Sequence, residues 1–152
     1  MPSFFSKLTL KDQTEILVLN APDSFEPELA ALTGIKILRD AGEVQEIVFA
    51  LIFVTTLQSI ETAAEIIAQK AKGDALIWFA YPKGTSKRYK CNFNRDNGWE
   101  ALGNVGFERV RQVAIDEDWT AMRFRRVEFV KAMTRRETFA LTEEGKAKTT
   151  QN

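Results

Sequence analysis

The sequence predicts a single three-layer α/β domain, in which helices cover both faces of a mostly parallel sheet that ends in an antiparallel hairpin. Three observations predict this fold. Between residues 15 and 81 short apolar runs alternate with helical segments, as in parallel strands joined by crossovers. Residues 46–54 (EIVFALIFV) show almost no polar alternation, which is typical of a strand covered on both faces. Further on, three acidic residues alone separate two apolar runs, a connection that only antiparallel neighbours allow.

The first part of the chain supplies three of the predicted strands and a short helix. We expect the strands at residues 15–20, 35–38 and 46–54. After the first strand, Asp23 or Ser24 would cap a helix whose first turn suits Pro27. Gly34 would give that helix its left-handed stop.

The longest helix is predicted at residues 55–72. Thr55 and Gln58 stand at capping-box spacing, and Gly73 would end the helix. Its apolar stripe consists of Leu57, Ile60, Ala64, Ile67, Ala68 and Ala71.

The rest of the chain predicts one more parallel strand, one helix and the hairpin. The strand falls at residues 74–81, the helix at 95–105, and the hairpin strands at 107–115 and 119–124. Trp99 and Leu102 would face inward from the helix, and Gly106 would end it. We divide the chain into a domain at residues 1–138 and a polar, aperiodic tail at 139–152.

The composition excludes several kinds of site. The chain of 152 residues has no histidine, which removes the side chain best suited to proton transfer near neutral pH and every Ser-His or Cys-His pair. Cys91 is the single cysteine, so no intrachain disulfide can form and a reducing cytoplasm is the expected location. We expect no metal site, and no apolar run is long enough for a membrane-spanning helix.

Positive charge is concentrated in the second half of the chain. The net charge is zero, but residues 1–75 carry 6 basic and 11 acidic side chains and residues 76–152 carry 15 and 10. One basic patch consists of Lys83, Lys87, Arg88, Lys90 and Arg95; the other consists of Arg123, Arg125, Arg126, Lys131, Arg135 and Arg136. Solvated charge is the simpler interpretation, and the binding of anions or nucleic acid is the alternative.

The candidate binding site follows from the predicted sheet. In an open parallel sheet, ligands bind at the carboxyl ends of the strands. The residues that lie there are Asn20, Pro22, Asp40, Thr55, Thr56, Lys83, Thr85 and Ser86. Among them Lys83 is the strongest candidate for contact with an anion.

Neither loop at this edge has the sequence of a standard phosphate site. The turn after the first strand reads NAPDSF; it has no glycine, Pro22 lacks an N–H donor, and Asp23 brings a negative charge. The loop PKGTSK has the residue types of a P-loop, but Lys83 precedes the single glycine, whereas a P-loop needs G-x-x-x-x-G-K-[ST].

Several segments together resemble a family of small bacterial proteins known only as a domain of unknown function. They are residues 78–83 (WFAYPK), 95–99 (RDNGW) and 113–124 (VAIDEDWTAMRF), with Ala21-Pro22 and Phe25 in the first turn. The resemblance covers about residues 10–127.

The strand order that this resemblance implies is similar to that of class I S-adenosylmethionine-dependent methyltransferases. It implies a Rossmann-like, methyltransferase-like fold, and S-adenosylmethionine as the cofactor of an active member. In those enzymes the first turn is rich in glycine and an acidic residue after the second strand holds the ribose; Asp40 stands at that second position. NAPDSF departs from the glycine motif, and residues 53–56 (FVTT) depart from the Asn/Asp-Pro-Pro box that some members use.

We therefore expect a degenerate methyltransferase-like domain with no cofactor. It would bind a small anionic ligand or a protein partner at the cleft of Asn20, Thr55, Thr56 and Lys83 and catalyse no reaction. The alternative is an active methyltransferase with a non-standard cofactor turn, and a second alternative is a nucleic-acid or anion binder that uses the basic patches. We expect no membrane contact, and a homodimer stays open, through the hairpin edge or an apolar face at Val127, Phe129, Val130 and Met133.

Overall fold

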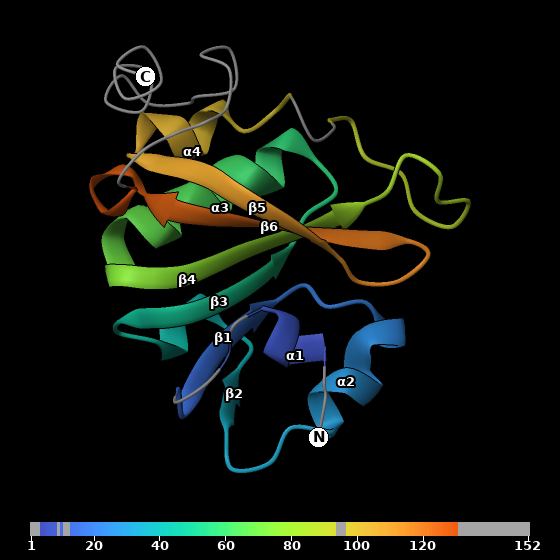
Figure 1. Cartoon of the computed structure of the whole chain (residues 1–152), viewed down its shortest axis with the longest axis horizontal. Coiled ribbons are helices and arrows are strands. Elements are labelled where there is room, and N and C mark those ends of the chain that lie inside the picture. Colours follow the sequence, from blue (N-terminus) through green and yellow to red (C-terminus); the bar gives the residue numbers. More distant parts are fainter. Residues whose placement is uncertain (1–3, 9, 11–12, 94–96, 131–152) are drawn as a thin grey trace.

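The computed structural model describes residues 4–8, 10, 13–93 and 97–130, and within them lies one sheet. Its strands are β1 (Glu15–Leu19), β2 (Lys36–Leu38), β3 (Ile47–Phe53), β4 (Ala71–Pro82), β5 (Phe107–Ala114) and β6 (Trp119–Arg126). They are arranged in the order β2-β1-β3-β4-β6-β5 (Figure 1). Among these strands only β6 runs in the opposite direction to the others, so its pairings with β4 and β5 are antiparallel. The predicted α/β fold, mostly parallel with a C-terminal antiparallel hairpin, is confirmed.

Helices cover both faces of the sheet (Figure 1). The elements are α1 (Phe4–Lys7), α2 (Glu26–Ala30), α3 (Leu57–Lys70) and α4 (Glu100–Asn104), with 3₁₀ turns η1 (Asp23–Phe25), η2 (Ala41–Glu43) and η3 (Val127–Phe129). On one face α3 and α4 bury Ile60, Ile67 and Leu102 against the sheet. On the other face α1, η1 and α2 bury Phe5, Phe25 and Leu29. Each face therefore has its own hydrophobic core.

The middle of the sheet is apolar on both faces because β4 lies between two long neighbours. It pairs with β3 in parallel and with β6 antiparallel, and its Trp78, Phe79 and Ala80 have no exposed surface. The indole Nε1 of Trp78 donates a hydrogen bond of 3.0 Å to the carbonyl oxygen of Leu8. That bond fixes α1, which the sequence did not predict, onto the sheet.

The first predicted helix begins without the side-chain cap that we expected. Neither Asp23 nor Ser24 caps it: η1 starts at Asp23, the preceding residue is Pro22, and no side chain accepts a hydrogen bond at the start of η1 or α2. Pro27 lies in the first turn of α2, as predicted. The prediction of a capping carboxylate or hydroxyl was therefore wrong, because the chain enters through a 3₁₀ turn.

The long helix α3 is one residue out of step with the predicted capping box. Its capping box consists of Thr56 and Ser59, not Thr55 and Gln58, because the backbone stays extended until Thr56. Leu57, which we placed on the buried stripe, is 40 % exposed. The stripe does bury Ile60, Ala64 and Ile67, together with Ala63.

The helix also ends before the predicted stop. Ala71 already pairs with Ile47 in β4, so strand pairing ends α3 at Lys70 and Gly73 lies inside the strand with φ +57°. The shift in register between Ile47 and Phe49 accommodates this glycine. The predictions that Ala71 belongs to the helical stripe and that Gly73 ends the helix were therefore wrong.

Fewer helical residues precede β5 than we expected. Residues 94–96, where the predicted helix begins, lie outside the described residues, and α4 starts at Glu100. Trp99 and Leu102 are buried as predicted. Met133 and the whole tail at 139–152 also lie outside the described residues. None of the helices that the structure describes is both long and apolar enough to span a bilayer.

We expect the substitution Gly98→Ala to destabilise the fold strongly. Gly98 has φ +102°, and a Cβ there would lie 2.6 Å from Cβ of Phe93 and 2.9 Å from Cδ2 of Leu57. Backbone strain and overpacking together should lower the free energy of unfolding by about 3 kcal/mol, measurable by urea denaturation. Gly84→Ala is the matched control, because no atom lies within 4 Å of that Cβ position; equal effects of the two variants would contradict this account of Gly98.

Candidate functional site

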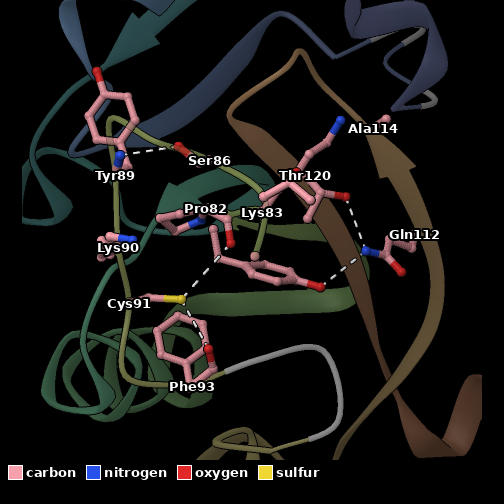
Figure 2. A pocket seen from close by; sticks show the side chains of 13 residues that line it. Pro82, Lys83, Ser86, Tyr89, Lys90, Cys91, Phe93, Gln112, Ala114 and Thr120 are labelled. Carbon is pink, nitrogen blue, oxygen red and sulfur yellow. Dashed lines mark hydrogen bonds between the residues drawn. The ribbon is translucent and has the colours of Figure 1, made fainter.

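A hollow of about 750 Å³ lies at the carboxyl end of β4 (Figure 2). Residues 83–93, the loop that follows β4, form one wall, and the hairpin of β5 and β6 forms the other. Figure 2 shows Gln112 and Thr120 on the hairpin side and Cys91 and Phe93 on the loop side. The last residues of the strand, Tyr81 and Pro82, also line the hollow.

The hairpin wall carries a fixed polar network. Nε2 of Gln112 donates hydrogen bonds of 3.1 Å to the hydroxyl of Tyr81 and of 3.1 Å to Oγ1 of Thr120. The Thr120 hydroxyl donates in turn to the carbonyl oxygen of Val113, at 3.3 Å. Tyr81 and Thr120 are cross-strand partners of β4 and β6, so strand pairing sets the positions of the polar groups that line this wall.

The loop wall is attached to the hairpin turn through Asp118. The backbone N–H of Lys83 donates to the Asp118 carbonyl oxygen at 2.8 Å, and the Ser86 hydroxyl donates to Oδ1 of Asp118 at 2.8 Å. Oγ of Ser86 also accepts a hydrogen bond from the backbone N–H of Tyr89. Ser86 and Asp118 are buried, at 5 % and 8 % exposure, so water does not compete for these bonds. The start of the loop is held firmly against the hairpin.

The lower part of the loop wall is aromatic and contains the cysteine. The Phe93 ring is buried and its centroid lies 5.8 Å from that of Tyr81. Sγ of Cys91 donates to the Phe93 carbonyl oxygen at 3.0 Å, so the thiol is engaged in holding the loop. The hollow thus combines aromatic surface with polar groups, as small-molecule sites do.

The charge that lines the hollow is positive. Lys83 and Lys90 are among its lining residues, and no aspartate or glutamate is among those that the structure describes there. Asp118 lies behind Ser86, which takes up one of its oxygens. In the described ranges no three His, Cys, Asp or Glu side chains are grouped to hold a metal ion.

The structure divides the sequence-predicted site residues among three places. Lys83, Thr85 and Ser86 line the hollow described above. Asn20 and Thr56 line a second hollow, of about 340 Å³, beside the start of α3. Pro22, Asp40 and Thr55 line neither of these two hollows. The single cleft of Asn20, Thr55, Thr56 and Lys83 that we expected is therefore not what these two hollows show.

The point where the strand order reverses, between β1 and β3, is bridged by a side chain. Asn20 has a left-handed backbone, with φ +62°, and its Nδ2 donates to the carbonyl oxygen of Phe53 at 3.3 Å. On the face that α1 and α2 cover, a series of aromatic rings runs across the sheet. The distances between ring centroids are 5.0 Å from Phe25 to Phe53, 5.1 Å from Phe53 to Trp119 and 4.8 Å from Trp119 to Tyr89. Side chains of the protein itself therefore fill this edge on the face that α1 and α2 cover, whereas the hollow of about 340 Å³ lies on the face of α3.

The basic patches are split by the fold. Lys83 and Lys90 line the hollow, whereas Arg88 lies over the ring of Tyr89, 5.4 Å from its centroid. Arg126 lies over Phe107 at 4.8 Å, on the sheet face opposite to Arg123. Residue 95 of the first patch and residues 131, 135 and 136 of the second lie outside the described residues.

The sequence analysis missed the polar wall of the hollow: Tyr81, Gln112 and Thr120. The signal that could have found them is the hairpin register. The turn at residues 116–118 places Ala114 opposite Thr120 and Gln112 opposite Met122. Counting back from the turn would have set Gln112 and Thr120 on one face, although the bond to Tyr81 also needs the pairing of β4 with β6.

Comparison with solved structures gives the fold class. The chain is similar to an S-adenosylmethionine (SAM)-dependent methyltransferase from Aquifex aeolicus, with a TM-score of 0.57 and 10 % identity over 80 % of this chain and 87 % of that one. It is similar to a putative type 11 methyltransferase from Sulfolobus solfataricus, with a TM-score of 0.50 and 12 % identity over 81 % and 77 %. Identities this low show the fold alone: the chain has a methyltransferase-like, Rossmann-like α/β fold.

No protein-family model matches the sequence, and no curated protein matches it. The comparisons therefore support the methyltransferase-like fold that the resemblance implied, and they give no support to the small bacterial family or to its sequence motifs.

We expect Ser86→Ala to destabilise the protein by about 2 kcal/mol, because the buried Asp118 carboxylate loses a donor. The measurement is the free energy of unfolding in urea. Thr85→Ala is the matched control: Thr85 is exposed, and the buried hydrogen bond to Asp118 comes from Ser86. A loss below about 0.5 kcal/mol for Ser86→Ala would show that the loop does not depend on this bond.

Proposed function

We propose that this protein is a methyltransferase-like domain that binds a small anionic ligand in the hollow beside Lys83 and catalyses no methyl transfer. The observation that carries the proposal is the composition of that hollow: lysines, a fixed amide and hydroxyl network and aromatic surface, with no acidic side chain among its described lining residues. Its volume of about 750 Å³ lies within the range of small-molecule sites.

Lys83 is suited to recognise the negative group. Its backbone is held at both ends: its N–H donates to Asp118, and its carbonyl oxygen accepts from the N–H of Ser86 at 3.0 Å. The side chain therefore starts from a fixed point and keeps its compact ammonium group for a carboxylate or phosphate. Gln112 and Thr120 would orient the remainder of the ligand through hydrogen bonds.

The residues at the first turn do not fit S-adenosylmethionine in the way that the methyltransferase resemblance implies. Pro22 cannot donate, Asp23 brings a carboxylate to the start of η1, and α2 has only five residues. Asn20 bridges β1 and β3, where a doubly wound sheet binds its ligand. Asp40, the candidate for the ribose, accepts a hydrogen bond from Gly42 N–H at 2.9 Å. No step of methyl transfer is therefore assigned to these residues.

We expect S-adenosylmethionine and S-adenosylhomocysteine to give no binding heat in isothermal titration calorimetry at micromolar protein concentration. The physical reason is the first turn, which has no glycine and in which Pro22 has no N–H donor and Asp23 adds a negative charge. An active SAM-dependent methyltransferase, titrated in the same buffer, is the positive control. Micromolar binding would overturn the non-catalytic proposal and favour an active methyltransferase with a non-standard turn.

We expect Lys83→Ala to abolish ligand binding without loss of stability. The probe is sodium benzoate, a small aromatic carboxylate that matches the lysine and the aromatic wall. It should shift the side-chain amide resonances of Gln112 in NMR spectra of the native protein and leave them unmoved in Lys83→Ala. The free energy of unfolding should change by less than about 0.5 kcal/mol.

Lys87→Ala is the matched control, because Lys87 is exposed in the same loop and does not line the hollow. This variant should keep the full response to benzoate. Equal responses of Lys83→Ala and the native protein, or equal losses in both variants, would contradict an anion site at Lys83.

A further inference from the structure

The face of the hairpin that points away from the hollow carries two arginines in direct opposition. Arg111 of β5 and Arg123 of β6 are cross-strand partners. They share the face of Val113 and Ala121, which belongs to the core under α1 and α2. Like charges directly opposite each other destabilise a sheet. The placement of these two arginines therefore does not stabilise the hairpin, and we looked for another role for it.

The acidic groups on this face are committed to other partners. Arg125 forms two hydrogen bonds with Asp74, from Nε at 2.8 Å and from Nη2 at 2.7 Å. Glu108 stands opposite Arg125 in the register and has partners of its own. With the residues that the structure describes, the side chains of Arg111 and Arg123 form no ion pair and no hydrogen bond.

Arg123 is half-buried, and its Nε is buried without a hydrogen-bond partner. Desolvation lowers the pKa of the Arg123 guanidinium, and the charges of Arg125 and Arg111 lower it further against the opposing effect of Asp74. A buried donor without an acceptor costs free energy. An anion between the two arginines would supply the acceptor and cancel the repulsion.

We propose that Arg111 and Arg123 form a binding site for an oxyanion group, a phosphate or a carboxylate, on the face of the hairpin opposite to the hollow. Paired guanidinium groups suit such ligands because each presents several N–H donors in one plane. Arg111 is exposed, so the site opens to solvent on that side. It is separate from the Lys83 hollow and does not depend on the function proposed there.

The test is thermal unfolding of the full chain carrying Lys83→Ala, which removes the anion site proposed in the hollow, with sodium phosphate or sodium acetate, each against sodium chloride at equal ionic strength. At about ten times the Kd the bound anion should raise Tm by about 4 °C. A larger shift with phosphate identifies a phosphate site, and a larger shift with acetate identifies a carboxylate site. Shifts equal to that of chloride with both anions overturn the proposal.

Two further substitutions, each made in the Lys83→Ala chain, localise the effect. Arg111→Gln and Arg123→Gln should each abolish the anion-dependent shift, and Arg111→Gln should keep or raise the Tm measured in chloride, because it removes the repulsion. Lys36→Gln, which removes one exposed charge from β2 at the other edge of the sheet, is the control and should keep the shift. An anion-dependent shift that persists in Arg111→Gln overturns the site even if Arg123→Gln does not fold.

Discussion

The architecture of the hollow depends on one residue of the hairpin turn, Asp118. Its carbonyl oxygen accepts the hydrogen bond from Lys83 N–H and its carboxylate accepts the one from Ser86. The turn itself is held by Asp116, whose Oδ1 accepts bonds of 2.8 Å from the backbone N–H groups of Asp118 and Trp119. A short acidic turn, which on sequence grounds is an ordinary solvated connection, thus connects the two walls of the hollow and sets the distance between them.

The same edge of the sheet shows why a methyltransferase-like fold does not imply a methyltransferase site. Fold places the carboxyl ends of β1, β3 and β4 side by side, but the side chains at those ends decide what can bind. At β1 and β3, Asn20 bridges the two strands, and the rings of Phe25 and Phe53 fill the edge on the face that α1 and α2 cover. At β4 a hollow lies between the hairpin and the loop that follows the strand, and the start of this loop is held against the hairpin turn.

Much of the fold could be predicted from the sequence, because a strand that is covered on both faces leaves an apolar run in the sequence. Most of the observed strand bounds fall within two residues of the predicted ones. Errors arose where tertiary pairing overrode local preference. Gly73 is a helix stop by its residue type, yet pairing of Ala71 with Ile47 starts the strand earlier. Lys83 could be placed at the sheet edge by the strand pattern alone. Counting back from the hairpin turn would also have set Gln112 and Thr120 on one face. Their contact with Tyr81 could not be predicted, because it needs the pairing of β4 with β6, which the local sequence does not give.

A single extra residue in β5 determines the chemistry of both faces of the hairpin. The register shifts between Arg109 and Arg111, so that Arg109 opposes Phe124 and Arg111 opposes Arg123. Because neighbouring residues of β6 point to opposite faces, these two arginines of β5 face opposite ways, although strict alternation would put them together.

The consequence reaches the hollow. Suppose that the bulge at Val110 were absent and that the residues between Arg111 and the turn kept their partners. Strict alternation would then move Phe107, Glu108 and Arg109 each to the other face of the sheet. The buried Phe107 would then leave the core under α3 and α4, at a cost that one inserted residue avoids. The bulge therefore lets β5 keep Phe107 in the core at one end while it directs Gln112 into the hollow and Arg111 to the opposite face at the other.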